Sequence, residues 1–137
     1  MNTLRAFLVE DSALLSENIA EALEELAPIK VVGTAEDEPG ATAWLAANSD
    51  SCDLLIIDIQ LKRGSGFGVL RAAGKLARPL ARVVLTNYAT GPMREHCANL
   101  GANRLFDKST EFGVFLEYCV SLANGETGPG YLGPPEI

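Results

Sequence analysis

The sequence predicts an α/β fold, in which a mainly parallel β-sheet lies between two layers of helices. Short apolar runs of strand length alternate with helical patterns along most of the chain, and the connections between them are short. Strands in such a series return to the sheet by right-handed crossovers through the helices. We count five strand–helix units, and the third run is apolar on both faces, which indicates a central strand covered from both sides.

The first unit has clear boundaries in the sequence. The apolar run Leu4–Val9 predicts a strand, and apolar residues then recur at helical spacing. Ser12 can cap this helix at its start, and Pro28 stops it. The second unit follows as a strand at 30–34 and a helix at 40–48.

The remaining three units continue the alternation. Leu54–Ile57 is the apolar third strand, and the helix expected at 67–76 tolerates Gly74 at some cost in stability. An apolar stripe at helical spacing over Phe112–Ala123 predicts the last helix. The other expected elements are strands at 82–85 and Arg104–Asp107, and a helix at 92–100.

Length and composition are those of one globular domain. The chain has 137 residues, of which 47% are hydrophobic and 21% charged, close to the average of soluble proteins. We expect one domain over residues 1–124 and a flexible tail at 125–137, where Gly and Pro prevent a continuing helix. Three cysteines without C-x-x-C spacing indicate buried free thiols in a reducing compartment.

The charge of the chain argues against two classes of partner. A formal net charge of −7 is the opposite of the basic footprint that phosphate-backbone binding requires, and it disfavours an anionic membrane surface. No basic-then-apolar leader opens the sequence, and no apolar run approaches the length of a membrane span. We therefore expect a cytoplasmic protein that binds neither nucleic acid nor membranes.

Reactive side chains follow four of the five predicted strands. Glu10 and Asp11 follow the first strand, Asp58 the third, Thr86 the fourth and Lys108 the fifth. The carboxyl ends of parallel strands meet at one edge of a sheet, where ligand sites of open α/β sheets form. The sequence therefore predicts one site that contains three carboxylates, a hydroxyl and an ammonium group.

These residue types suit magnesium-dependent phosphoryl transfer. Carboxylates brought this close oppose folding unless a cation lies between them, and Mg²⁺ prefers such oxygen ligands. An aspartate such as Asp58 can attack phosphorus directly and form an aspartyl phosphate. Lys108 can pair with a phosphoryl oxygen as a point charge, and the Thr86 hydroxyl can donate a hydrogen bond to another.

This ordered set resembles the receiver domains of response regulators in two-component signalling, of the single-domain chemotaxis-regulator type. The resemblance covers roughly residues 3–124 and implies that Asp58 is the phosphoacceptor. It also implies that Asp11 binds Mg²⁺ directly and Glu10 through water, and that Asp58 itself and the backbone carbonyl of Gln60 are further ligands. Thr86 matches the family's switch hydroxyl and Lys108 its phosphate-contacting lysine.

The resemblance further implies a flavodoxin-like receiver fold with strand order 2-1-3-4-5, which places the first and third strands side by side. The phosphoryl donor would be a histidine kinase or a histidine phosphotransfer protein. A downstream protein partner would bind the face formed by the fourth helix, fifth strand and fifth helix. The domain would catalyse only its own phosphorylation and dephosphorylation.

Three positions depart from the family pattern, one of them Lys62, which stands where the family usually has a proline after the phosphoacceptor. Leu105 stands where the family often has an aromatic residue, and Ser109 where it often has a cis-proline. Two other functions stay open. One alternative is a receiver-like docking module that never carries phosphate. The other is a phosphatase with an aspartate nucleophile, which needs a second aspartate where this chain has Gln60.

Overall fold

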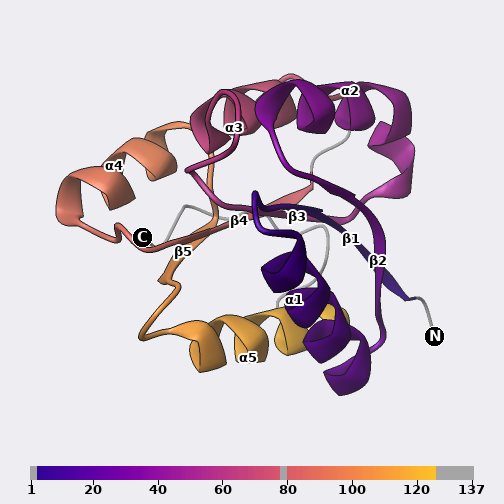
Figure 1. Ribbon diagram of the computed structural model, residues 1–137. Coiled ribbons are helices and arrows are strands. Elements are labelled where there is room, and N and C mark those ends of the chain that lie inside the picture. Colours follow the sequence, from indigo (N-terminus) through magenta and orange to yellow (C-terminus); the bar gives the residue numbers. More distant parts are fainter. Residues whose placement is uncertain (1–2, 78–79, 126–137) are drawn as a thin grey trace.

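The computed structural model describes residues 3–77 and 80–125. Five parallel strands form one sheet in the order β2-β1-β3-β4-β5, which confirms the predicted fold class and strand order. The strands are β1 (Leu4–Val9), β2 (Ile29–Ala35), β3 (Leu54–Ile57), β4 (Ala81–Thr86) and β5 (Arg104–Asp107). Because β1 and β3 are neighbours, the carboxyl ends of the first and third strands lie side by side (Figure 1).

Helices cover both faces of this sheet (Figure 1). One face carries α1 (Ala13–Leu26) and α5 (Phe112–Ala123). The other carries α2 (Glu38–Asn48), α3 (Gly66–Gly74) and α4 (Gly91–Asn99), and a short 3-10 turn, η1 (Ser49–Ser51), follows α2. This is the doubly wound arrangement that the alternating pattern predicts.

Capping residues explain why helices begin earlier than the sequence predicts. The second helix begins at Glu38 and not at residue 40, because the Asp37 side chain caps it by accepting a hydrogen bond from the Gly40 nitrogen. Ser65 likewise caps α3, which begins at Gly66, one residue earlier than predicted. This helix ends at Gly74 and not at residue 76. The predicted Ser12 cap of α1 is confirmed, with the Ser12 hydroxyl accepting from the Leu15 nitrogen.

Each face of the sheet has its own hydrophobic core. Leu55 and Ile57 of β3 pack towards α2, α3 and α4, whereas Leu54 and Ile56 pack towards α1 and α5. All four β3 residues are buried, which confirms that this strand is central. The three cysteines are free and buried, as predicted.

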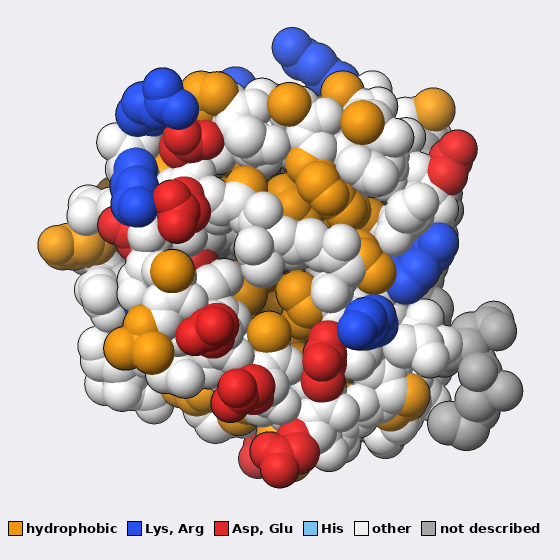
Figure 2. Space-filling model, turned by 45° about the vertical axis from the view of Figure 1, so that its right-hand side comes forward, with side chains coloured by type: hydrophobic (Ala, Val, Ile, Leu, Met, Phe, Trp, Pro, Cys, Tyr) orange, Lys and Arg blue, Asp and Glu red, His pale blue; other side chains and the backbone are white. Residues whose placement is uncertain are grey.

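Charge is unevenly distributed over the surface. Figure 2 shows Asp and Glu side chains gathered over the lower half of one face, with few Lys or Arg side chains among them, in keeping with the net charge of −7. Among the described residues, no helix is long and apolar enough to cross a membrane. The expected tail lies almost wholly outside the described residues, so the division at residue 124 stays a prediction.

Candidate functional site

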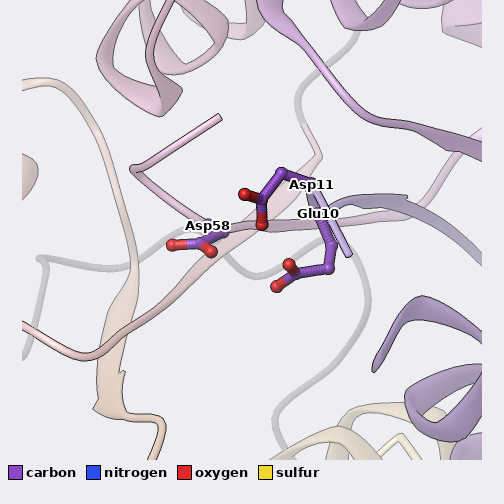
Figure 3. A group of neighbouring side chains, drawn as sticks. All are labelled: Glu10, Asp11 and Asp58. Atoms are coloured by element: carbon purple, nitrogen blue, oxygen red, sulfur yellow. The ribbon is translucent and has the colours of Figure 1, made fainter. Parts of the chain in front are cut away.

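The register of β1 and β3 brings the predicted carboxylates together. Val9 pairs with Ile57 across the two strands, and the Asp58 nitrogen donates to the Val9 carbonyl at 2.9 Å. Glu10 and Asp58, the next residues along each strand, therefore emerge next to each other at the carboxyl edge of the sheet. Figure 3 shows the side chains of Glu10, Asp11 and Asp58 gathered there.

These three carboxylates form a compact oxygen cluster. One ligand oxygen from each of Glu10, Asp11 and Asp58 lies within 4.8 Å of the other two. Glu10 is only 3% exposed and Asp58 7%, while Asp11 is more accessible to solvent. Glu10 also accepts a hydrogen bond from the Ser12 nitrogen at 2.9 Å, which fixes its orientation at the start of α1.

Lys108 links two of the carboxylates. Its Nζ atom lies 2.7 Å from Asp58 Oδ2 and 2.7 Å from Glu10 Oε1. The backbone nitrogen of Lys108 donates to the Thr86 carbonyl at 2.8 Å, so the side chain is anchored at the end of β5. Burial lowers the pKa of Lys108, but its hydrogen bonds with Asp58 and Glu10 outweigh burial and raise it overall.

Burial at this edge of the sheet changes the pKa of Glu10. Burial, followed by its hydrogen bond with Asp11, raises the pKa of Glu10 to about 7, against the lowering effect of Lys108. The Lys108 ammonium contacts two of the three carboxylates, so the fully ionised cluster carries more negative charge than this ammonium balances. An all-oxygen donor set with unbalanced negative charge fits a hard divalent cation such as Mg²⁺.

Thr86 and Gln60 flank the cluster. Thr86 is fully buried at the end of β4, and its hydroxyl oxygen accepts a hydrogen bond from the Tyr88 nitrogen at 3.2 Å. The Gln60 nitrogen donates to Asp58 Oδ1 at 3.3 Å, which places this residue beside the carboxylate. The expected ligand role of the Gln60 carbonyl stays a prediction.

Leu105 and Ser109, two of the departures from the family pattern, have different structural settings. Leu105 is buried in the core beneath α4, while its neighbour Phe106 packs on the opposite face against Phe115 of α5. The Ser109 hydroxyl donates to Asn87 Oδ1 at 3.2 Å and so links the loops after β4 and β5. The described residues contain no cis peptide bond.

Sequence reasoning missed the contacts around the loop that follows Asp58. An acidic run, residues 36–38, lies against Lys62 and Arg63 of that loop. The opposite charges of the two segments are visible in the sequence, but nothing in the sequence shows that segments 26 residues apart meet. Arg94 of α4 is a second such case, because it contacts Glu111 at 3.2 Å and the Leu105 carbonyl at 3.4 Å.

The raised pKa of Glu10 predicts how stability depends on pH. In the unfolded chain Glu10 loses its proton near its ordinary value of 4.5, whereas the folded protein keeps it up to about pH 7. This group therefore stabilises the fold fully below pH 4.5, and that stabilisation is lost as the pH rises through 7. Without metal, we expect the free energy of unfolding to fall by roughly 1–3 kcal/mol between pH 5 and 8 because of Glu10.

Urea unfolding of the wild type and of Glu10→Gln, each in a chelator at pH 5 and pH 8, measures this contribution. The difference between the two proteins reports the contribution of Glu10 together with its effect on the groups that it contacts, because all other groups are common to both. Equal pH dependence in the two proteins would contradict the assignment. Excess Mg²⁺ is expected to reverse the trend, since a bound cation favours the ionised carboxylate.

Comparison with known proteins places these features in a family. A family model, the response regulator receiver domain, matches residues 6–118. Response regulator UvrY of Escherichia coli O6:H1 is 32% identical over 102 residues, which cover 72% of this chain and 44% of UvrY. The chain thus spans less than half the length of that relative.

Solved structures of response regulator domains are similar to this chain. The non-phosphorylated HemR receiver domain of Leptospira biflexa is 29% identical, with a TM-score of 0.75 over 88% of this chain and 96% of that one. The phosphorylated cyanobacterial phytochrome response regulator RcpA is 26% identical, with a TM-score of 0.76 over 96% of this chain and 99% of that one. The response regulator domain of Thermotoga maritima CheB, at 19% identity and a TM-score of 0.77 over 90% of this chain and 98% of that one, shares the fold.

Proposed function

This chain belongs to the response regulator receiver domain family, and from that premise we propose that it accepts a phosphoryl group on Asp58 with Mg²⁺ bound. The observation that carries the proposal is the contact of Lys108 with Asp58 and Glu10 inside a cluster of three carboxylates. A buried nucleophile, a cation next to it and an oxygen-rich metal site are the parts that phosphoryl transfer requires. The domain would then act as a phosphorylation-dependent switch in a two-component or phosphorelay system.

In the proposed reaction, a carboxylate oxygen of Asp58 attacks the phosphorus of a phosphohistidine. A new O–P bond forms, the P–N bond breaks, and the imidazole leaves with that electron pair and takes up a proton. The Lys108 ammonium would pair with a phosphoryl oxygen and offset its negative charge. The donor would be a histidine kinase or a histidine phosphotransfer protein.

Four groups would hold the metal. Asp11 and Asp58 would bind Mg²⁺ through carboxylate oxygens, Glu10 through water, and Gln60 through its backbone carbonyl. The ion would neutralise charge that otherwise repels the incoming phosphoryl group. The close approach of the carboxylate oxygens, of which the Lys108 ammonium contacts only two groups, supports a cation at this place.

Thr86 would transmit the phosphorylation of Asp58 to the protein surface. Its hydroxyl accepts from the Tyr88 nitrogen, which leaves the hydroxyl proton available for a phosphoryl oxygen. Movement of Thr86 would shift the loop before α4 and so alter the face formed by α4, β5 and α5, where a downstream partner would bind. Arg94 supports this route, because it ties α4 both to the Leu105 carbonyl and to Glu111.

Intact-mass measurement tests the proposal directly. The protein is incubated with Mg²⁺ and a small acyl phosphate, and a labile phosphoryl adduct is expected on the wild type. Asp58→Ala should carry no adduct, whereas Asp50→Ala, which removes an exposed aspartate, should be labelled like the wild type. Failure of the wild type to label at saturating donor and metal would favour the docking module that never carries phosphate.

A further inference from the structure

The acidic run Glu36, Asp37 and Glu38, between β2 and α2, contacts the loop that follows the proposed phosphoacceptor. Glu36 forms an ion pair with Lys62 at 3.0 Å, and Asp37 forms one with Arg63 at 2.8 Å. The main chains also meet, because the Glu38 nitrogen donates to the Arg63 carbonyl at 2.9 Å. The loop is thus held along one side by a segment from another part of the sheet.

Glu38 contacts the main chain of this loop and is closely packed against it. Its Oε1 accepts a hydrogen bond from the Ser65 nitrogen at 3.0 Å. Ser65 is the N-cap of α3, so the carboxylate lies at the positive end of that helix. Gly64 and Gly68 flank it, and a Cβ atom at Gly68 would collide with both carboxyl oxygens of Glu38.

A short chain of contacts leads from Glu38 to the site. Ser65 pairs with Gln60 in an isolated antiparallel bridge, and the Gly66 nitrogen donates to the Ile59 carbonyl at 2.8 Å. The loop therefore closes back on itself directly beyond Asp58. Gln60 donates its own nitrogen to Asp58 Oδ1, so the residue paired with Ser65 is the one that touches the carboxylate.

The two exposed ion pairs, Glu36–Lys62 and Asp37–Arg63, hold the loop less firmly than Glu38 does. Lys62 is 57% exposed and Arg63 76% exposed, and ion pairs between exposed side chains contribute little because solvent screens them. Glu38 instead accepts from a main-chain nitrogen at a helix terminus and lies against two glycines. A hydrogen bond to a charged acceptor is stronger than one between neutral groups.

We propose that Glu38 is a positioning residue: its carboxylate holds Ser65 and, through the Ser65–Gln60 bridge, sets the place of the Gln60 carbonyl at the metal. This inference rests on the proposed function, because it takes the Gln60 carbonyl to be a Mg²⁺ ligand. Outer groups that orient metal ligands commonly change metal affinity by about tenfold or more when removed. Glu38 is not itself a ligand in this arrangement.

Calorimetric titration with Mg²⁺ on the full chain tests the inference, with unfolding in a chelator measured in parallel. Glu38→Ala is expected to weaken Mg²⁺ binding by about tenfold. Glu38→Gln keeps an oxygen acceptor for Ser65 and should lose less affinity. Glu25→Ala removes an exposed charge on α1. This variant should bind Mg²⁺ with an affinity within about twofold of the wild type, because salt screens a distant surface charge.

Gly68→Ala provides a test that leaves Glu38 in the chain. The new methyl group should displace the Glu38 carboxylate from Ser65, while alanine suits a helix interior better than glycine. Mg²⁺ affinity should therefore fall although α3 itself is favoured. If Glu38 served stability alone, Gly68→Ala would not lower the Mg²⁺ affinity of a protein that remains stably folded.

The outcomes distinguish this inference from the proposed function. If the wild type neither binds Mg²⁺ nor accepts phosphate, the proposed function is wrong. If the wild type does both, and Glu38→Ala and Gly68→Ala bind Mg²⁺ as tightly as the wild type, only the positioning role is overturned. Weaker Mg²⁺ binding in both variants, with the Glu25→Ala control unchanged, supports it.

Discussion

Lys108→Met is expected to destabilise the metal-free protein by about 3–5 kcal/mol at neutral pH, because it leaves buried carboxylates without their cation. The Lys108 ammonium lies 2.7 Å from both Asp58 and Glu10, and both of those residues are buried. Methionine has a similar length and flexibility, so the substitution removes the charge with little change in packing. Urea unfolding in a chelator at pH 7 measures the loss.

Lys62→Met is the matched control for this substitution. Lys62 also forms an ion pair, with Glu36 at 3.0 Å, but both side chains are exposed, and we expect a change below about 1 kcal/mol. Saturating Mg²⁺ should restore part of the stability of Lys108→Met, since the metal supplies the missing positive charge. A variant as stable as the wild type without metal would show that Lys108 is not the cation that balances this cluster.

Gly66→Ala is expected to destabilise the protein by about 2–3 kcal/mol and to impair labelling of Asp58, because there is no space for a methyl group. A Cβ atom at Gly66 would overlap the Asp58 carbonyl oxygen and would lie 2.8 Å from Ile59 Cα. Most of the atoms it meets belong to the backbone, which cannot swing aside as the end of a side chain can. Relief of the overlap would move the main chain next to the phosphoacceptor.

Gly113→Ala is the control, since that glycine lies in α5 with nothing within 4 Å of the added carbon. This variant should be as stable as the wild type or up to about 1 kcal/mol more stable, because alanine favours a helix. Thermal unfolding of both variants gives the comparison, and the acyl phosphate assay reports on the site. Equal stability of Gly66→Ala and Gly113→Ala would refute the close packing at residue 66.

The fold was predictable because its signals are local. Leu54–Ile57 is apolar on both faces, and a strand of this kind has a stable place only in the middle of a sheet covered on both sides. Helix starts were less predictable. Asp37 and Thr90 cap α2 and α4 ahead of their apolar stripes, so periodicity alone placed the starts of these helices later in the chain.

The members of the candidate site were predictable for a related reason. Glu10, Asp58 and Lys108 each follow an apolar strand, and in a parallel sheet the carboxyl ends of the strands share one edge. The contacts among them were not predictable. Which carboxylates Lys108 would reach depends on register and side-chain direction, which only the folded chain defines.

The sequence by itself determined the α/β class, the central place of β3 and the edge at which the reactive side chains gather, because hydrophobic periodicity and strand direction are properties of short segments. Only the tertiary structure decided that Lys108 lies between Asp58 and Glu10, and that Glu38 lies on Ser65 between two glycines. The physical reason is that these contacts join segments 26 or more residues apart, and their geometry depends on how all the intervening elements pack.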